Sequence, residues 1–401
     1  MEPETCGQLQ TVHTLTTHLM KKSIIAIFVP SYQIGGAEKV LVQLANSLLA
    51  HFDEVHMLSN TLDGPLKEQL DPSIRRIHFG NNSYKRVFFD LISYYNEFKP
   101  DVVITSLYAT GIVACAACQL SRHKPVLLIG AHNSFSAKLA APDNIKDKYL
   151  LKPLSRLLFH RADAVVSVSR GVSDDLALTL SLPSAKLHVI YNPVVSPDLI
   201  QKSLEPLEHR WLGDRNQRIY KTILSVGRLV EQKGYDILLE AFSSLPNRDG
   251  YRLVIVGDGP LAKPLFAKAK ALGIEESVDF VGYDLNPYRY MSRADIFVLS
   301  SKWEGLPTVL IEAMACGCSI VATDCPYGPN EILENGKYGA LVPVADAQAL
   351  TNSILETLNG KSGLVSLTDL KCRANDFTDL RATDAYVELI KRLIDKPATV
   401  V

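Results

Sequence analysis

Short apolar runs rich in β-branched residues alternate, along the first half of the chain, with longer segments whose apolar positions recur at helical spacing. Glu38–Leu49 is a segment of the helical kind. The apolar runs, which we predict to be strands, are Ile24–Val29, Glu54–Leu58, Asp101–Thr105, Val126–Gly130, Ala164–Val168 and Lys186–Ile190. Fully apolar strands separated by helices predict a parallel sheet that is covered on both faces.

The alternation stops over residues 195–220, which are polar and carry a charged run. A second series of predicted strands follows: Thr222–Val226, Arg252–Val256, Val278–Val281, Ile296–Leu299 and Ser319–Ala322. The sequence therefore predicts an α/β protein with two doubly wound, Rossmann-like domains that face a central cleft. We expect a flexible N-terminal extension over 1–19, domains over 20–200 and 201–375, and a terminal segment over 376–401.

Composition narrows the class of protein. The chain of 401 residues has 42 Lys and Arg against 43 Asp and Glu, and this balance argues against a protein-wide nucleic-acid-binding surface. Cys115 and Cys118 lie in an apolar run without a second ligand pair at zinc-site spacing, so we expect buried thiols in a reducing cytosol. No apolar run approaches the roughly 18–20 residues of a membrane span. The run Ser23–Val29 resembles a short signal peptide, but Pro30 ends it and no cleavage site follows.

Glycine-rich turns follow several of the predicted strands, at the edge where open α/β sheets bind ligands. Gly35 and Gly36 open the first predicted helix, where closely approaching amides and the helix N-terminus suit a phosphate. Gly257 and Val281 end two later strands and bring backbone groups to the same edge of the second sheet. Each of these turns is also compatible with a plain connection between strand and helix.

Charged or titratable residues also follow two of the predicted strands. Arg228 and Lys233 follow the strand Thr222–Val226 beside glycines, and two cations at a strand end suit a diphosphate. His132 follows the strand Val126–Gly130 and shares the rim of the first sheet with the paired glycines. A lone histidine is usually structural, but this position favours a functional role.

The stretch WEGLPTVLIE, residues 303–312, carries a glutamate near each end. Pro307 is a favourable first helical residue, which places Glu304 on a loop and Glu312 inside a helix. The first amides of that helix form an anion site between the two carboxylates. These amides belong to Thr308 and Val309. Two carboxylates on either side of a phosphate pocket suit hydroxyl binding better than acid–base chemistry, and ordinary surface charge is the alternative.

Together these motifs, between about Ile24 and Pro343, resemble the retaining glycosyltransferases of glycosyltransferase family 4, which have the two-domain GT-B fold. Glu304 and Glu312 fit the family's E-x7-E signature. The resemblance implies that Glu304 contacts hydroxyls of the donor sugar and that Glu312 contacts the nucleotide ribose. It also implies a C-terminal helix, near Thr383–Ile394, that crosses back to the first domain.

The resemblance further implies the roles of the remaining site residues. Those with a catalytic role are His132, Arg228, Lys233 and Glu304. Those that bind the donor are Gly35, Gly36, Arg228, Lys233, Gly257, Val281, Glu304, Leu306, Thr308, Val309 and Glu312. The implied reaction is a front-side displacement at the anomeric carbon, in which the leaving diphosphate is stabilised electrostatically. It requires no metal and no cofactor.

The segment Thr323–Leu333 resembles bacterial members that use UDP-linked hexoses or N-acetylhexosamines to extend polysaccharides or lipid-linked glycans. The expected partners are accordingly a nucleotide sugar and a glycan or lipid-linked acceptor, without nucleic acid. Another GT-B sugar-nucleotide enzyme, such as an epimerase or a phosphorylase, remains an alternative. A catalytically silent sugar-nucleotide binding protein is a further one.

A basic stripe indicates where a membrane would lie. Lys148, Lys152, Arg156 and His160 recur at four-residue spacing beside leucines. Such a stripe suits an anionic membrane that presents a lipid-linked acceptor, while an amphipathic helix packed on the sheet is the alternative. We expect a cytoplasmic protein with peripheral contact at the cytoplasmic face of the membrane.

Overall fold

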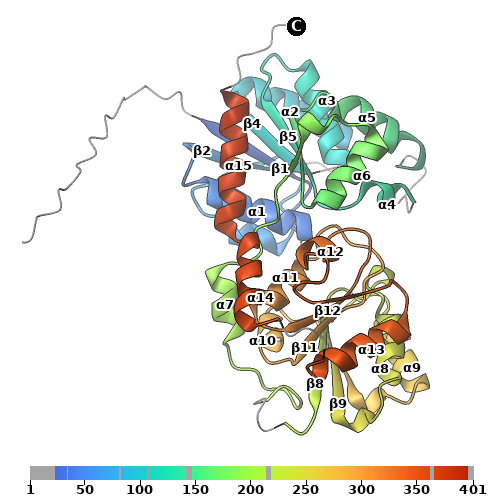
Figure 1. Ribbon diagram of the computed structural model, residues 1–401. Helices are drawn as coiled ribbons and strands as arrows, with labels where there is room; N and C mark the ends of the chain where they lie inside the picture. Colours follow the sequence, from blue (N-terminus) through green and yellow to red (C-terminus); the bar gives the residue numbers. More distant parts are fainter. Residues whose placement is uncertain are drawn as a thin grey trace, which may run out of the picture.

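The computed structural model describes residues 23–33, 35–80, 83–106, 108–140, 147–213, 218–361 and 365–395, and it contains two parallel sheets, one in each of two stacked domains (Figure 1). The first sheet has seven strands in the order β3-β2-β1-β4-β5-β6-β7. These strands are β1 (Ile24–Val29), β2 (Glu54–Ser59), β3 (Arg75–His78), β4 (Val102–Ser106), β5 (Val126–Ala131), β6 (Ala164–Ser167) and β7 (Leu187–Val189). The predicted N-terminal extension lies outside the described residues.

The second sheet has six strands in the order β10-β9-β8-β11-β12-β13. These strands are β8 (Lys221–Val226), β9 (Tyr251–Val256), β10 (Val278–Gly282), β11 (Ile296–Leu299), β12 (Ser319–Thr323) and β13 (Ala340–Val342). In both sheets the chain moves outward in one direction and then crosses to the other side of its first strand. This reversal creates a switch point where ligands bind in open α/β sheets. The predicted pair of doubly wound sheets is confirmed.

Helices cover both faces of each sheet (Figure 1). Those of the first domain are α1 (Gly36–Leu48), α2 (Tyr84–Phe98), α3 (Ala109–Leu120), α4 (Phe135–Ala140), α5 (Lys152–Phe159) and α6 (Arg170–Leu180). Those of the second are α8 (Tyr235–Ser243), α9 (Ala262–Ala271), α10 (Tyr288–Met291), α11 (Thr308–Ala315), α12 (Pro329–Ile332), α13 (Ala347–Leu358) and α14 (Leu367–Ala374). No helix among the described residues is long and apolar enough to span a membrane.

The polar stretch after the first sheet contains α7 (Pro197–Ser203), which is capped by the Ser196 hydroxyl and packs against α10. One local prediction needs correction. Pro307 is not the first residue of α11 but its N-cap, with φ −69° and ψ +93°. Its extended ψ keeps the loop before α11 from joining the helix, so the first helical amides belong to the residues after it.

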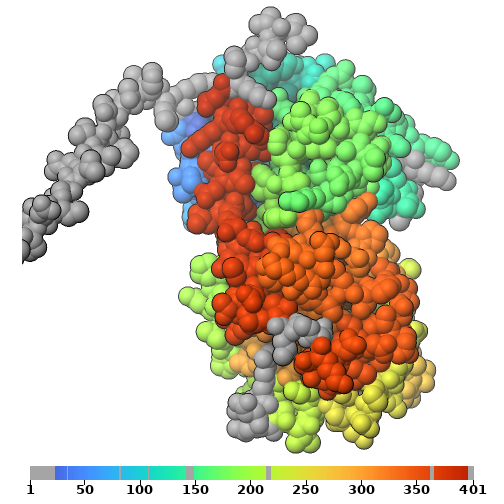
Figure 2. Space-filling view, viewed as in Figure 1, coloured from blue at the N-terminus to red at the C-terminus, as the bar shows by residue number. Residues whose placement is uncertain are grey.

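The last helix, α15 (Asp379–Ile394), returns to the first domain, where it lies along that domain's outer side (Figures 1 and 2). Tyr386 and Ile390 are buried in the same core cluster as Ile25 and Ile27 of β1. Its predecessor α14 packs instead against α11 of the second domain. The chain therefore crosses between the domains at the short turn between these two helices. Helix α15 contains the range Thr383–Ile394, where the family resemblance implies a returning helix.

Direct contacts also hold the domains together, where segments near residues 170 and 330 touch in Figure 2. Both carboxylate oxygens of Glu331 accept from the amide of Arg170, the first residue of α6, at 3.0 and 2.8 Å. The Tyr191 hydroxyl donates to the same carboxylate at 2.8 Å. Ser169 donates to the carbonyl of Gly305 at 3.0 Å. A carboxylate at a helix N-terminus is favourable, so this contact stabilises the mutual placement of the two domains.

Candidate functional site

Two loops of the second domain are joined at the carboxyl ends of their strands. The Ser300 hydroxyl, after β11, donates to the carbonyl of Lys233, after β8, at 2.8 Å. The amide of Lys302 donates to the carbonyl of Gln232 at 2.7 Å. Gly234 has a φ of +62°, and a Cβ there would collide with the Ser300 carbonyl. This close backbone approach brings the side chain of Lys233 to the loop that begins WEGLPTVLIE.

Glu304 is buried and lies at the centre of this junction. Its Oε1 accepts from Lys233 Nζ and from Ser301 Oγ, each at 2.6 Å. Gln232 Nε2 donates to Oε2 at 3.3 Å. A buried carboxylate needs a counter-charge and hydrogen bonds. Lys233 supplies the charge for Glu304, and Ser301 and Gln232 donate further hydrogen bonds. The sequence predicts Lys233 and Glu304 as separate donor contacts, whereas the structure pairs them with each other.

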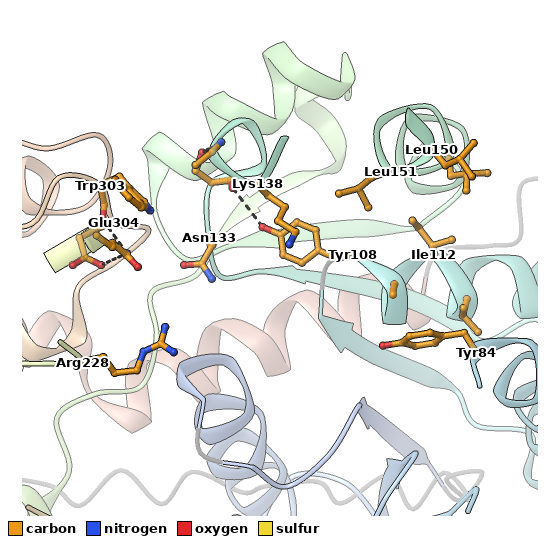
Figure 3. Close-up of a pocket in the computed structure, with 16 residues that line it drawn as sticks. Tyr84, Tyr108, Ile112, Asn133, Lys138, Leu150, Leu151, Arg228, Trp303 and Glu304 are labelled. Atoms are coloured by element: carbon orange, nitrogen blue, oxygen red, sulfur yellow. Dashed lines mark hydrogen bonds between the residues drawn. The ribbon is translucent and has the colours of Figure 1, made fainter. Parts of the chain in front are cut away.

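A cavity of about 730 Å³ lies between the domains beside this pair (Figure 3). The second domain contributes polar side chains to it: Arg228, Gln232, Trp303 and Glu304. The first domain contributes a mixed wall: Tyr84, Tyr108, Ala109, Ile112, Val113, Asn133, Ser134, Ala137, Lys138, Leu150, Leu151 and Leu154. Arg228 points into this space toward Asn133 (Figure 3). Two of the predicted catalytic residues, Arg228 and Glu304, therefore line one cavity.

His132 lies just behind this wall. A Cβ on Gly305 would lie only 2.5 Å from the His132 carbonyl, so the loop after β5 packs directly on the loop that carries Glu304. Both ring nitrogens are buried, with the Asn192 side chain as a polar neighbour. Burial lowers the pKa of His132 to about 4, an effect that the Asn192 side chain partly offsets. The ring is therefore neutral at physiological pH.

We expect the burial of His132 to make folding pH-dependent. Below about pH 6.5 the unfolded chain takes up a proton on this residue, whereas the folded protein does so only near pH 4. Stability is thus complete above the unfolded pKa and falls as the pH drops through this window, by roughly 2 kcal/mol between pH 7.5 and pH 5. Urea unfolding of wild type and His132→Gln at both pH values measures the effect. Equal pH dependence in the two proteins would contradict it.

Glu312 lies apart from Glu304. It belongs to α11, where the Tyr288 hydroxyl donates to its carboxylate and Lys39 of α1 provides a positive field from the first domain. Burial nevertheless raises the pKa of Glu312 above its ordinary value, and the same burial raises the pKa of Tyr288. The two glutamates of the signature thus have different surroundings. Glu304 lines the cavity and pairs with Lys233, whereas Glu312 accepts from Tyr288.

The remaining predicted donor residues lie at helix starts and strand ends. Gly35 is the N-cap of α1 and Gly36 its first residue, where an added Cβ would meet no atom within 4 Å. Thr308 and Val309 form the first turn of α11, which has no side-chain N-cap among the described residues. The others are Gly257 and Val281 at the ends of β9 and β10, and Leu306, which is buried. The structure places these groups where the sequence predicts; whether they bind a donor stays a prediction.

Several residues of the cavity were missed from the sequence. Gln232 and Trp303 stand next to predicted site residues, so their neighbourhood was itself a usable signal. Tyr108 follows β4 and Lys138 lies in the six-residue helix α4. Neither residue belongs to a sequence motif that indicates binding or catalysis. They reach the cavity only because α3, α4 and α5 pack beside the second domain.

Comparison with known families covers most of the chain. A sequence model described as "Glycosyltransferase Family 4" matches residues 34–196, and one described as "Glycosyl transferases group 1" matches residues 215–371. A relative from Campylobacter jejuni is the N-acetylgalactosamine-N,N'-diacetylbacillosaminyl-diphospho-undecaprenol 4-alpha-N-acetylgalactosaminyltransferase, 33% identical over 250 residues. This alignment spans 62% of the chain and 64% of that relative, somewhat less than two thirds of its length.

A second Campylobacter jejuni relative is matched almost end to end. It is the GalNAc-alpha-(1->4)-GalNAc-alpha-(1->3)-diNAcBac-PP-undecaprenol alpha-1,4-N-acetyl-D-galactosaminyltransferase, 27% identical over 91% of the chain and 98% of its own length. Among solved structures, HepE of Anabaena in complex with UDP has a TM-score of 0.74 at 21% identity, covering 92% of the chain and 100% of HepE. The structural likeness supports the shared two-domain fold.

Proposed function

The chain belongs to the family 4 glycosyltransferases of the GT-B type, and on this premise we propose that it transfers a hexosyl or N-acetylhexosaminyl group from a UDP sugar to a glycan or lipid-linked acceptor. The observation that carries the proposal is the buried carboxylate of Glu304, which faces the interdomain cavity together with Arg228. Acceptors of this chemistry are also those that the names of the two Campylobacter relatives describe.

In this proposal the donor separates the pair that the free protein forms. The Lys233 ammonium, now 2.6 Å from Glu304, turns to the diphosphate, and the freed carboxylate accepts hydrogen bonds from sugar hydroxyls. Arg228 and the first amides of α11 stabilise the charge that develops on the leaving group. The leaving diphosphate accepts the proton of the attacking hydroxyl, and the new bond forms on the face from which the diphosphate departs.

The proposed reaction needs no metal ion, because protein cations face the site of the leaving group. Lys233 and Arg228 both follow β8, one within the buried pair and one in the cavity wall. A silent binding protein or another GT-B sugar-nucleotide enzyme would retain these contacts but would not transfer sugar to an acceptor. Transfer that survives excess EDTA is therefore the result that separates the proposed enzyme from these alternatives.

Donor screening by thermal unfolding tests the donor class. A ligand that binds only the folded state at about 100 times its Kd adds roughly 2.7 kcal/mol of stability. We expect UDP-GlcNAc, UDP-GalNAc, UDP-galactose or UDP-glucose to raise the melting temperature more than GDP- or ADP-sugars do. The same sugar should then release UDP when the enzyme is present. No shift with any nucleotide sugar would exclude the proposed function.

The proposal also includes contact with a membrane, but the basic residues do not lie on one continuous helix as the four-residue spacing suggests. The predicted stripe is not one α-helix: Asp147–Leu151 form a π-helical turn, and α5 begins at Lys152. The side chain of Lys148 lies outside the described residues. Lys152 and Arg156 are exposed beside Leu154 and Leu157, a combination that suits the surface of an anionic membrane on the cytoplasmic side.

Liposome flotation tests this contact. Vesicles with anionic lipid should retain the wild-type protein at low salt, and replacement of Lys148, Lys152 and Arg156 by alanine should reduce retention, because each basic residue near the surface contributes about 1 kcal/mol. Equal retention of the two proteins would argue against this face.

A further inference from the structure

The interdomain cavity has two chemically different ends. One end carries the polar side chains of the second domain, including Glu304 and Arg228. The other end is formed by apolar side chains on helices of the first domain, including Ile112 of α3 and Leu150 of the π-helical turn. Figure 3 places these ends on opposite sides, with Tyr108 and Lys138 between them. A single continuous space thus runs from the candidate donor site to an apolar wall.

The apolar wall is open to solvent. Leu150 is 51% exposed and Leu154 39%, whereas Leu151 beneath them is only 6% exposed. Leucines held around a concave surface keep their apolar area in contact with water, which is unfavourable unless a ligand covers it. Pockets that bind small molecules are typically lined in this way, with a few polar groups that fix orientation.

A cation marks the middle of the cavity. Lys138 Nζ lies 6.0 Å from the centroid of the Tyr108 ring, close enough for a favourable cation–π contact. Lys138 and Tyr108 both line the cavity, so the ammonium lies at the cavity wall beside the ring (Figure 3). A ligand that follows the cavity therefore meets hydroxyl-binding groups first, a positive charge next and hydrocarbon last. An amphiphile in which a phosphate joins a sugar to a hydrocarbon chain has its groups in the same order.

We propose, resting on the function proposed above, that the apolar end binds the hydrocarbon chain of a lipid-linked acceptor and that Lys138 contacts the phosphate joining chain to sugar. The polar end of this cavity of about 730 Å³ is the candidate donor site, which leaves little room between it and Lys138. The hydrocarbon of the acceptor must therefore follow closely on the acceptor sugar. The acceptor is a glycolipid with a short glycan, because a free polysaccharide has no group to cover the leucines.

Decyl phosphate, kept below its micelle concentration and titrated calorimetrically into the full-length protein, tests the site without knowledge of the acceptor sugar. Decyl glucoside has the same hydrocarbon but no phosphate, and inorganic phosphate has no hydrocarbon. We expect decyl phosphate to bind most tightly. Leu150→Ser should weaken both decyl compounds about tenfold through lost apolar contact. Lys138→Gln should weaken decyl phosphate and leave decyl glucoside unchanged.

Matched controls separate the cavity from the outer surface. Leu178, 83% exposed on α6, does not line the cavity, so Leu178→Ser should bind decyl phosphate like wild type. Lys263→Gln, an exposed lysine of α9 in the second domain, should do the same. Equal losses in Leu150→Ser and Leu178→Ser, or no binding by wild type, would overturn the proposal. Binding as expected without any UDP-sugar thermal shift would support this site and reject the transferase function.

Discussion

Glu304→Gln is expected to reduce the enzyme-dependent release of UDP from the donor by at least ~100-fold, the usual cost of removing one charged contact from a transition state. Glutamine keeps the volume and the Ser301 hydrogen bond, so the loop retains its shape. It removes the negative charge that makes the carboxylate a strong acceptor for sugar hydroxyls. UDP itself should still bind, because in our proposal Glu304 contacts the sugar and not the diphosphate.

The second domain offers a matched control for this substitution. Glu240 forms an ion pair with Lys268 at 2.5 Å, which is more exposed than the Glu304–Lys233 pair, and neither residue lines the cavity. Glu240→Gln removes the same charge and should keep full activity. A Glu304→Gln protein that releases UDP at a near-normal rate would show that Glu304 does not hold the donor sugar.

Lys233→Met should lower the rate by about 10²–10³-fold and also weaken the binding of UDP. Methionine preserves the length of the side chain but cannot neutralise a diphosphate. The melting-temperature shift with UDP should therefore shrink in Lys233→Met and persist in Glu304→Gln. Lys268→Met removes a lysine from the comparable ion pair and serves as the control. An unchanged UDP shift in Lys233→Met would contradict its role as a phosphate ligand.

The double variant addresses the coupling between the two side chains. Breaking the pair from one side leaves the partner's charge buried, which costs up to several kcal/mol, whereas removing both charges leaves none uncompensated. We expect Lys233→Met/Glu304→Gln to be more stable than the sum of the single effects predicts. Its activity should nonetheless be no better than that of the worse single variant, because transfer needs both contacts.

The strands were predictable where they are buried on both faces, because such strands are continuous runs of apolar residues. β1 and β11 lie in the interior of their sheets, so they read as continuous apolar runs, and their predicted bounds are those of the structure. β3 and β13 were absent from the predicted strands. Both are edge strands: β3 is largely exposed and β13 has only three residues. An edge strand packs on one neighbour only, so it need not carry an apolar run.

The positions of the candidate site residues followed from the same local signals, but their surroundings did not. Arg228, Lys233 and Glu304 were predicted at carboxyl ends of strands, and the structure places them there. The ion pair between Lys233 and Glu304 joins residues 71 positions apart. No spacing rule reports such a pair, because it depends on how two loops of the same sheet edge approach each other.

The sequence by itself determined two parallel sheets, the loops at their carboxyl ends and the charged residues those loops carry, because strand periodicity, glycine turns and helix starts are properties of short segments. The tertiary structure alone decided which of these groups act together. Contacts between domains, such as that of Ser169 with Gly305 across 136 positions, set the loops of one sheet against those of the other. That packing buries the ring nitrogens of His132 and joins the polar end of the cavity to the apolar wall. Packing within the second domain gives the two glutamates different partners.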